Sequence, residues 1–501
     1  MLRKLLIAVV VLLVLAAGLY VVAARVLGSG LVRTTLEQQL SARLGQPVRI
    51  GAASAAIYPR VAIDLRDVSI GAPAGVTAGR VRVVTGLRPL LSRIIQDAEI
   101  IVEDGELRLP LPFDLFPSAP GAAAPPTESP LTVVSIQTIE LRRFTLAAGD
   151  ERWVVDADCT LAGDRLDVAR LTTHAKTTRL HGSGAVTSLS RTEGQFTVTG
   201  DPLDLDELIA FGSAATGPST TAAPSATAGS PLRIDLNLTA PSGTFAAHQF
   251  RDLSTTTVIT SGSLSLAPLA VAAFGGRFNG RLDADARKAV PLVRLNGRVE
   301  GLDMTEVMKA AGSDGGITGQ LGGRVDLSAA GTDSDALLRT ARGSIAAAIT
   351  NGTMPRLELV RSIVLAFGKP SGGPPEGSGS AFSRLGGTFA LANSVVTSND
   401  IHMASRDFDL DGAGSVALVS GAISGRGDVR LSRELTAQAG VDLRRYAQED
   451  GQVVVPATFG GTLQQPTVAL DVAAATRRAL GNEIQRRAKS LFDDLFRRRK
   501  K

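Results

Sequence analysis

The sequence has few of the residues that build disulfide frameworks, metal sites and nucleic-acid platforms. Its 501 residues include one cysteine, one tryptophan and four histidines, and aromatic residues make up 4%. A single cysteine excludes an intramolecular disulfide framework and a zinc site built from cysteines. The histidines are scattered, and a binder of nucleic acid would need a basic face with aromatic side chains for stacking. We therefore expect no cofactor, no metal and no nucleic-acid partner.

The sequence also lacks a complete catalytic motif. Gly368 and Lys369 are followed by Pro370, without the Ser or Thr of a phosphate-binding loop. Neither His-Glu-x-x-His nor Gly-x-Ser-x-Gly is present. We expect no catalytic residues, so an enzyme is not expected and a periplasmic hydrolase is the least supported hypothesis.

The positive net charge is concentrated at one end of the chain. The formal charge is +5, from 53 Lys and Arg against 48 Asp and Glu. The last five residues, Arg497 to Lys501, are all basic, which leaves the remainder neutral. Apolar residues make up 44%, and this composition excludes a wholly disordered chain.

Residues 1–28 have the pattern of a transmembrane signal anchor. Arg3 and Lys4 precede an uncharged apolar run from Leu5 to about Ala24. About 20 apolar residues at ~1.5 Å each match a hydrocarbon core of about 30 Å, whereas a cleaved signal peptide usually has an apolar segment of about 7–15 residues. The preceding positive charges favour a cytoplasmic N-terminus. We expect a single-pass inner-membrane protein with its C-terminal bulk in the periplasm of a Gram-negative bacterium.

Two short amphipathic helices are predicted outside the anchor. Val32, Leu36, Leu40 and Leu44 recur every four residues, and Gly45 then favours a helix end. At the other end, apolar residues from Leu480 to Phe496 share a helical face ahead of the basic tail. That second helix suits either an anionic membrane surface or a place against the protein's own sheet.

Between these helices the hydrophobic period is mostly two, which predicts strands. Alternation of this kind puts one face of an antiparallel sheet on apolar matter and the other in water. A β-sandwich with a filled core gives the same pattern, and periodicity alone favours the sandwich, because filled cores are far commoner than open grooves. Polar residues such as Asp235, Gln320 and Asp409 take the opposite parity. The candidate residues of the apolar face are Leu232, Ile234, Leu236, Leu238, Ile317, Leu321, Val325, Phe408, Leu410, Val416 and Leu418.

Low-complexity stretches divide the body into regions. Three segments rich in Pro, Gly, Ser, Ala or Thr predict flexible or extended loops. The predicted organisation is an anchor (1–28), an N-terminal region (29–116), a linker (117–130), a middle β region (131–211), a linker (212–231), a β region with short helices (232–367), a Gly/Pro-rich loop (368–380), a C-terminal β region (381–475) and a helix with a basic tail (476–501).

A weak internal repeat and the lone cysteine have structural interpretations. Asp201 to Ile209 resembles Glu300 to Met308, with Asp204 and Asp303 in equivalent places where a strand ends and a helix begins. We interpret both acids as helix caps rather than as paired catalytic carboxylates. Cys159 shares one strand parity with apolar neighbours, so we interpret it as an apolar filler rather than a nucleophile.

An ordered set of segments carries a family resemblance. Near the N-terminus the resemblance is carried by Leu44-Gly-Gln-Pro-Val-Arg-Ile-Gly, Ile57-Tyr-Pro-Arg-Val-Ala-Ile-Asp-Leu, Gly86-Leu-Arg-Pro-Leu-Leu and Ala98-Glu-Ile-Ile-Val-Glu-Asp-Gly. In the C-terminal third it is carried by Thr340-Ala-Arg-Gly-Ser-Ile, Ile349-Thr-Asn-Gly-Thr-Met-Pro, Gly387-Thr-Phe-Ala-Leu-Ala, Asp411-Gly-Ala-Gly-Ser-Val and Phe459-Gly-Gly-Thr-Leu. Taken in this order, the segments resemble the AsmA family. The stretch from about Gly121 to Gly280 matches least.

The resemblance implies a fold and a function. It implies a mainly β (α+β) chain in which a long curved antiparallel sheet with an apolar concave face forms a groove, similar to chorein-type bridge proteins that move phospholipids. It also implies an inner-membrane-anchored periplasmic protein that supports outer-membrane biogenesis, with phospholipid as a partner. A second hypothesis is a scaffold that assists the assembly or targeting of outer-membrane proteins without conducting lipid.

Overall fold

The described part of the chain forms two compact units. The structure, a computed structural model, describes residues 33, 37–38, 41, 45–56, 61–85, 94–95, 97–111, 132–133, 136–189, 191–216, 232–288, 290–312, 316–355, 379–438, 448–463, 465–471, 474 and 477. Unit 1 is Met1–Ala267 and unit 2 is Pro268–Lys501. The boundary falls within β15 (Ser263–Ala273), inside the segment 232–367 that the sequence predicts as one region.

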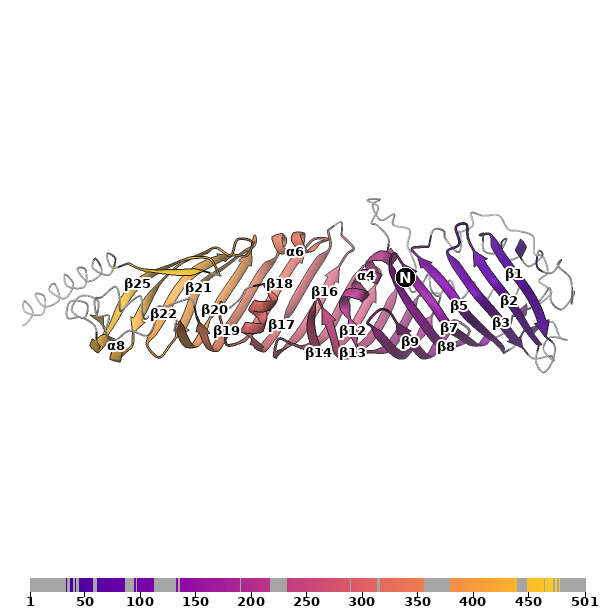
Figure 1. Cartoon of the computed structure of the whole chain (residues 1–501), viewed down its shortest axis with the longest axis horizontal. Coiled ribbons are helices and arrows are strands. Elements are labelled where there is room, and N and C mark those ends of the chain that lie inside the picture. Colours follow the sequence, from indigo (N-terminus) through magenta and orange to yellow (C-terminus); the bar gives the residue numbers. More distant parts are fainter. Residues whose placement is uncertain are drawn as a thin grey trace, which may run out of the picture. The chain divides into compact units, whose positions relative to one another are not determined.

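Unit 1 is built from strands that pair side by side (Figure 1). The pairing order is β1-β2-β3-β5-β7-β8-β9-β10-β11-β13-β14. The strands are β1 (Val48–Ala56), β2 (Val61–Ile70), β3 (Val76–Thr85), β5 (Ala98–Leu109), β7 (Ile136–Ala148), β8 (Glu151–Ala162), β9 (Arg165–His174), β10 (Arg179–Ser188), β11 (Glu193–Gly200), β12 (Leu203–Asp204), β13 (Arg233–Phe245) and β14 (His248–Thr260), with a separate small pair, β4 (Ile94–Ile95) and β6 (Thr132–Val133), and one helix, α4 (Leu205–Thr216).

Unit 2 repeats this architecture with antiparallel neighbours throughout its described pairs. Its elements are β16 (Gly276–Asp285), β17 (Leu292–Asp303), α5 (Met304–Ala310), β18 (Gln320–Ala330), α6 (Ser334–Thr340), β19 (Arg342–Met354), β20 (Ser380–Ala392), β21 (Val395–Ala404), β22 (Phe408–Ala417), β23 (Ile423–Leu431), α8 (Arg433–Gln438), β24 (Gln448–Glu449), β25 (Gln452–Gly461) and β26 (Pro466–Leu470). The prediction of a mainly β chain with a few short helices is confirmed.

The purely antiparallel prediction is wrong at two places in unit 1. β5 pairs with β7 in parallel, and β11 and β12 both pair with β13 in parallel. A parallel pair needs a crossover connection of a dozen or more residues. The segments predicted as linkers, 117–130 and 212–231, fall in these two connections, although α4 continues through Thr216 into the second.

Irregular residues keep apolar side chains on one face where strict alternation breaks. In β2, Leu65 and Val68 are both buried, and Asp67 between them adopts a φ of 53° and drops out of the register with β1. Asp104 in β5 and Arg143 in β7 have φ angles of 55° and 48°. Arg143 donates to the two carboxylate oxygens of Asp104 at 2.7 and 2.9 Å, which joins these two irregular positions. Such bulges shift the parity of each strand without moving its apolar residues to the wet face.

Two helices begin at the acids that the sequence repeat singled out. Asp303 accepts a hydrogen bond from the Thr305 backbone N–H at 2.7 Å, and these backbone donors hold the pKa of Asp303 below its usual value. Asp204 accepts from the N–H groups of Asp206 and Glu207 at 2.9 and 3.3 Å. The interpretation of both residues as helix caps is confirmed.

The outer edge of β1 is capped by polar side chains of a preceding helical segment. Residues Arg33, Glu37 and Ser41 are helical and spaced by four, so they lie on one side of the helix. Glu37 accepts from the Ile50 N–H at 2.7 Å, Ser41 accepts from the Val48 N–H at 2.8 Å, and Arg33 donates to the Gly51 carbonyl at 3.1 Å. These bonds satisfy edge groups that would otherwise be free to pair with another chain.

The anchor lies outside the described residues, and the two predicted amphipathic helices are described at only a few positions. The apolar residues predicted for the first helix, the anchor (1–28) and most of the C-terminal helix (476–501) lie outside the described residues. Among the helices that are described, none has the length and apolar character needed to cross a membrane.

We predict that Glu37→Ala weakens unit 1 by about 1–2 kcal/mol, because the Ile50 N–H loses its acceptor and the edge of β1 opens. Urea unfolding of the full chain, followed by fluorescence of the buried Trp153, measures this loss. Light scattering should detect increased self-association in the same variant. Gln38→Ala, at an exposed neighbour on the same helix, is the control. Equal stability of the two variants would contradict a role of Glu37 in edge capping.

Candidate functional site: the apolar face of the sheet

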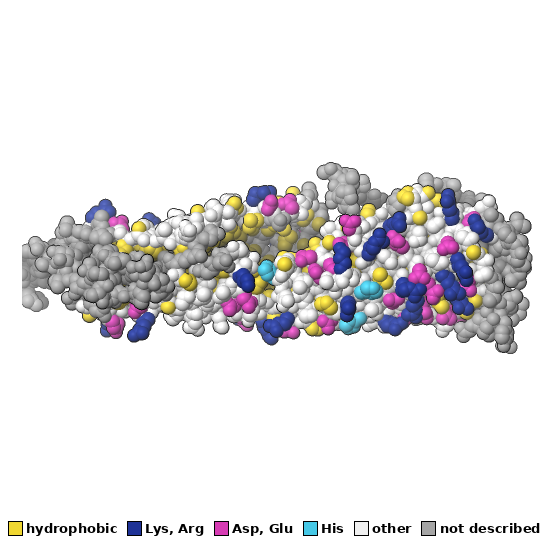
Figure 2. Space-filling model, in the orientation of Figure 1, with side chains coloured by type: hydrophobic (Ala, Val, Ile, Leu, Met, Phe, Trp, Pro, Cys, Tyr) yellow, Lys and Arg dark blue, Asp and Glu magenta, His cyan; other side chains and the backbone are white. Residues whose placement is uncertain are grey.

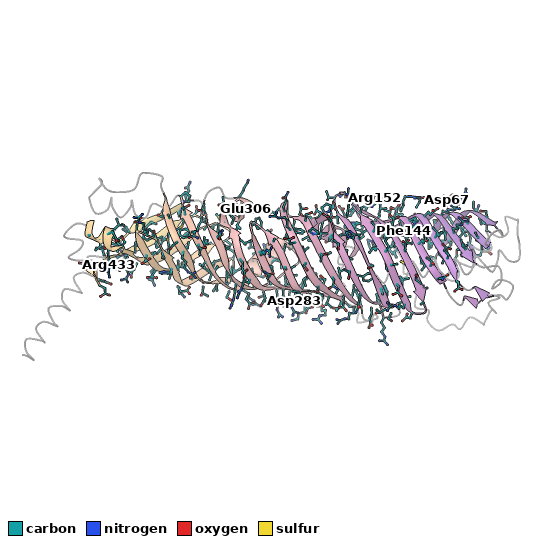
Figure 3. The ribbon with its side chains drawn as sticks, turned by 90° about the horizontal axis from the view of Figure 1, so that it is seen from below. Asp67, Phe144, Arg152, Asp283, Glu306 and Arg433 are labelled. Atoms are coloured by element: carbon teal, nitrogen blue, oxygen red, sulfur yellow. The ribbon has the colours of Figure 1, made fainter. Side chains whose placement is uncertain are left out.

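Each unit has one apolar face and one polar face. In β18, Leu321 and Val325 lie on the apolar face with half-buried side chains, while Gln320, Arg324 and Asp326 on the other parity are exposed. Figure 3 shows side chains standing on both sides of the strands. The two faces are therefore the surfaces to compare for a function.

On the polar face, basic side chains form ion pairs with nearby acidic side chains. Arg and an acid two residues away on the same strand pair repeatedly, as in Arg165–Asp167, Arg233–Asp235 and Arg281–Asp283. Exposed pairs of this kind contribute at most about 1 kcal/mol each. Figure 2 shows basic and acidic side chains interspersed over unit 1, without a patch of one sign.

In unit 1 the apolar face is filled by the chain's own side chains. Leu65, Val102 and Leu107 are 0% exposed and belong to one continuous cluster that extends over β1 to β10. Helix α4 contributes Ala215 to the cluster, and the Phe211 ring lies 5.7 Å from that of Trp153 in β8. This part of the face is a packed core.

A buried carboxylate fixes α4 on this face. Glu207 is 9% exposed and accepts hydrogen bonds from the Thr177 and Thr178 N–H groups at 2.9 and 3.0 Å and from the Thr177 hydroxyl at 2.5 Å. Burial by itself would raise the pKa of Glu207, but these donors outweigh burial and hold the pKa below its usual value. Asp206 accepts from the Ala246 N–H at 2.7 Å, so the helix start is tied to two separate turns.

In unit 2 the apolar face of β16 to β19 is not filled. All residues of these four strands are described, and none of their apolar side chains is fully buried. Figure 2 shows hydrophobic side chains lining a hollow beside α6. The half-buried residues on this face include Phe278, Leu282, Leu295, Val299, Leu321, Val325, Leu327, Ile345 and Ile349.

One row of directly opposed apolar residues crosses unit 2 from this open part to a buried part. Leu321 pairs with Ile349, Ile349 with Leu385, Leu385 with Met403, and Met403 with Leu410. The first three are half-buried, whereas Met403 is 0% exposed. Exposure therefore falls along the row from β18 to β21, and Leu410 in β22 is also buried.

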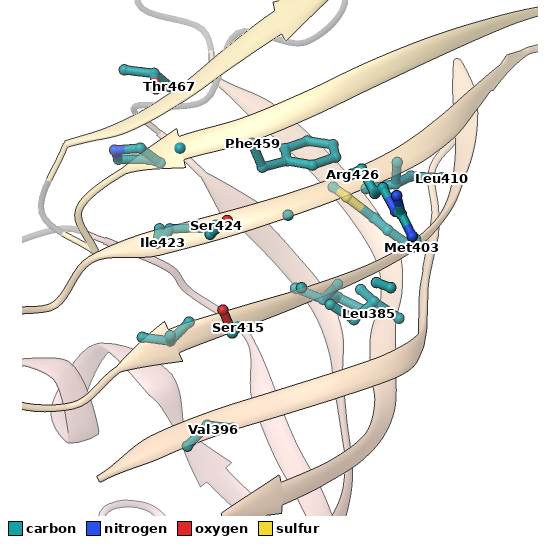
Figure 4. Close-up of a pocket in the computed structure, with 18 of the residues that line it drawn as sticks. Leu385, Val396, Met403, Leu410, Ser415, Ile423, Ser424, Arg426, Phe459 and Thr467 are labelled. Carbon is teal, nitrogen blue, oxygen red and sulfur yellow. The ribbon is translucent and has the colours of Figure 1, made fainter. Parts of the chain in front are cut away.

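The row borders a cavity of about 260 Å³. In Figure 4, Leu385, Met403, Leu410 and Phe459 converge on it from four strands. Arg426 borders the cavity too, but it alternates with the inward residues of β23 and its side chain is exposed. The inward side chains of the lining are almost all apolar, so the cavity suits a hydrocarbon rather than an ion.

The residues predicted for the apolar face fall into two groups. Ile234 is buried in unit 1, with Leu236 and Leu238 half-buried along the same strand and Leu232 just before it. The others lie in unit 2: Ile317 precedes β18, Leu321 and Val325 lie in it, Phe408 and Leu410 are buried in β22, Val416 lines the cavity, and Leu418 follows the end of β22 with 39% exposure. Whether any of them contacts lipid stays a prediction.

Other contributors to the cavity were not among the predicted residues. Leu385, Phe389, Met403 and Phe459 line it. A bulge in β21 between Ser398 and Ile401 shifts the parity ahead of Met403, which explains why a period of two did not select that residue. Leu385 and Phe389 share one parity of β20, so alternation could have selected both. Phe459 follows the alternation of β25 and could have been found by it.

Cys159 is a buried core residue, and His402 lies beside a carboxylate on the polar face. Cys159 is buried, and burial raises the pKa of its thiol to about 11, so the thiolate is scarce at neutral pH. His402 Nδ1 lies 2.7 Å from a carboxylate oxygen of Asp411 on the polar face. Among the described residues, no group of three or more His, Cys, Asp or Glu side chains is placed to hold a metal ion.

Comparison with known proteins confirms the family resemblance. The model of the AsmA family matches residues 206–401, which includes part of the stretch where the resemblance is weakest in the sequence. The chain is 23% identical over 346 residues to Protein AsmA of Escherichia coli (strain K12), covering 64% of this chain and 55% of that protein. The chain thus spans about half the length of this relative. No solved structure matches the chain.

We predict that Glu207→Gln destabilises unit 1 at pH 7, because hydrogen bonds to a neutral amide are weaker than those to a carboxylate. The lowered folded-state pKa fixes the sign: the carboxylate's contribution is fully present above its usual value of 4.5 and is lost as the pH falls through the folded value. Urea unfolding followed by Trp153 fluorescence measures the difference in free energy of unfolding between wild type and Glu207→Gln. We expect this stability gap to narrow below about pH 4.5.

Asp150 is an exposed acid in the turn between β7 and β8, and the variant Asp150→Asn controls for a general effect of removing a negative charge. A gap between wild type and Glu207→Gln that is the same at pH 7 and pH 3.5 would contradict this assignment.

Proposed function

We propose, taking the AsmA-family sequence of this chain as the premise, that the protein shields phospholipid acyl chains along the apolar face of unit 2. It would do so in the periplasm, anchored to the inner membrane through residues 1–28, in support of outer-membrane biogenesis. The observation that carries the proposal is that no apolar side chain on β16 to β19 is fully buried.

The energetic reason for such a surface is the cost of moving lipid through water. Exposing hydrocarbon costs about 0.8 kcal/mol for each CH₂, so a sixteen-carbon chain costs on the order of 12 kcal/mol. A sheet that offers side chains such as Leu321 and Val325 on one face removes much of that cost while its other face stays in water. No catalytic residue is needed for this activity.

A filled core is the alternative explanation of an alternating sheet, and the two units differ in this respect. In unit 1, residues such as Val102 have no exposure and belong to a core cluster that includes Ala215 of α4. In unit 2, residues of the same kind on β16 to β19 keep part of their surface. We therefore assign the shielding of lipid to unit 2 and a structural role to the packed face of unit 1.

A photo-crosslinking experiment tests the proposal. With benzoylphenylalanine in place of Leu321, the full chain incubated with vesicles of phosphatidylethanolamine and phosphatidylglycerol should crosslink to phospholipid. The same group in place of Gln320, which directly precedes Leu321 and lies on the polar face, should give at least about tenfold less product. The reason is that successive strand residues face opposite sides of the sheet. Mass spectrometry of the crosslinked chain measures both yields.

The control is close because both positions lie in one strand and differ only in the face they occupy. Ile234 and Leu410 are less suitable positions, since both are buried and a larger side chain would disturb packing. Equal lipid labelling at Leu321 and Gln320, or none at either, would contradict the proposal. Labelling of an outer-membrane protein instead of lipid would favour the scaffold hypothesis.

A further inference from the structure

Glycines form the floor of the cavity in unit 2, where Gly412, Gly414 and Gly425 line it. Gly412 pairs directly with Gly427, and Gly414 pairs directly with Gly425, across the β22–β23 ladder. All four share the parity of the apolar face, because Leu410 and Val429, on the same two strands, are buried there. The sheet is therefore bare of side chains over two adjacent strands at this point.

Large apolar residues surround this bare floor in register. Met403 and Leu410 oppose each other on one side, and Val416 opposes Ile423 on the other side. Along the row of Gly414 and Gly425, Phe459 stands directly opposite Gly425. The cavity of about 260 Å³ is thus a well with an apolar rim, formed by the cross-strand register.

We propose that this glycine-floored well is a discrete seat for one acyl-chain segment of a phospholipid, an inference that rests on the proposed function. An apolar cavity of about 150 Å³ holds a six-carbon ring. A well of about 260 Å³ therefore accommodates on the order of ten carbons. The charged side chain at its border, Arg426, alternates to the polar face, so the well recognises hydrocarbon and not a headgroup.

The occupant reaches the well along a continuous apolar path within unit 2. The row from Leu321 through Ile349 to Leu385 leads from the half-buried face to the rim of the well. An acyl chain lying on the open face can slide into the well without crossing a charged residue of that row. The well then adds a fixed position to a surface that otherwise holds chains without preference.

Filling the floor tests the seat. Gly425 does not adopt a positive φ, and a Cβ placed there would lie 3.1 Å from the Ala413 carbonyl and 3.6 Å from Phe459 Cβ. A valine at this position is compatible with a strand and occupies the well. The control is Ser424→Val. Ser424 also borders the cavity, but its side chain is exposed and alternates with the inward residues of β23, so a valine there adds its bulk to the polar face.

The measurement uses the full chain with benzoylphenylalanine at Phe459, to report on the well, or at Leu321, to report on the open face. The probe is a vesicle of phosphatidylglycerol with tritiated acyl chains. We expect Gly425→Val to lower labelling at Phe459 at least fivefold and to leave labelling at Leu321 unchanged, with Ser424→Val changing neither. Circular dichroism confirms the fold, and Gly425→Ala, which adds one carbon, should give an intermediate loss if the valine variant does not fold.

The outcomes separate this inference from the proposed function. Labelling at Leu321 with none at Phe459, or labelling at Phe459 that neither glycine variant reduces, overturns the seat while the shielding surface stands. Labelling at Phe459 without labelling at Leu321 supports the seat and contradicts the shielding surface. Absence of labelling at both positions overturns both.

Discussion

Cross-strand register is the constraint on which the rest of this structure depends. Successive residues of a strand face opposite sides, and antiparallel pairing sets residues of like character directly opposite one another. In unit 2 this brings Leu321, Ile349, Leu385 and Met403 into one row although they are far apart in the sequence. A slip of one residue in any strand would turn its apolar set into water, so the hydrophobic effect fixes the register and the register builds the surface.

The same constraint produces two outcomes because the surroundings of the face differ. In unit 1, the hydrogen bonds to Glu207 hold α4 against the sheet, and Phe211 and Ala215 add to a core that leaves Val102 without exposure. On β16 to β19 of unit 2, equivalent side chains remain half-buried. The glycine pairs in β22 and β23 go further and remove the side chains themselves. The apolar face is therefore packed in unit 1, partly exposed on β16 to β19, and hollow at β22 and β23.

Alternation was enough to predict the mainly β fold and much of the apolar face. It placed Trp153 through Cys159 on one parity, where the structure buries Trp153, Val155, Ala157 and Cys159. The cap positions Asp204 and Asp303 were also predictable, because a short acid where a strand ends and a helix begins has a local physical role. These features depend on neighbours in the sequence and need no knowledge of distant contacts.

Features set by distant contacts could not be predicted in this way. Bulges such as that at Asp67 shift a strand's parity, and their only local sign is a pair of polar residues inside an alternating run. The parallel pairings of β5 with β7 and of β11 with β13 depend on which strands become neighbours, and the composition does not reveal this. The edge cap could not be predicted from the apolar stripe of the first helix, because Glu37 acts through a partner, Ile50, that lies in the following strand.

The most direct test of the central claim compares two valines of the apolar face, Val102 in unit 1 and Val325 in unit 2. Each is replaced singly by cysteine in a Cys159→Ala background, and the rate of reaction with N-ethylmaleimide is measured on the delipidated, folded chain. Val102 is 0% exposed and Val325 is half-buried. We predict that Val325→Cys reacts at least about a hundredfold faster, because the buried position must wait for local opening. Equally slow reaction at both positions would mean that the face of unit 2 is filled like that of unit 1, and would contradict the account.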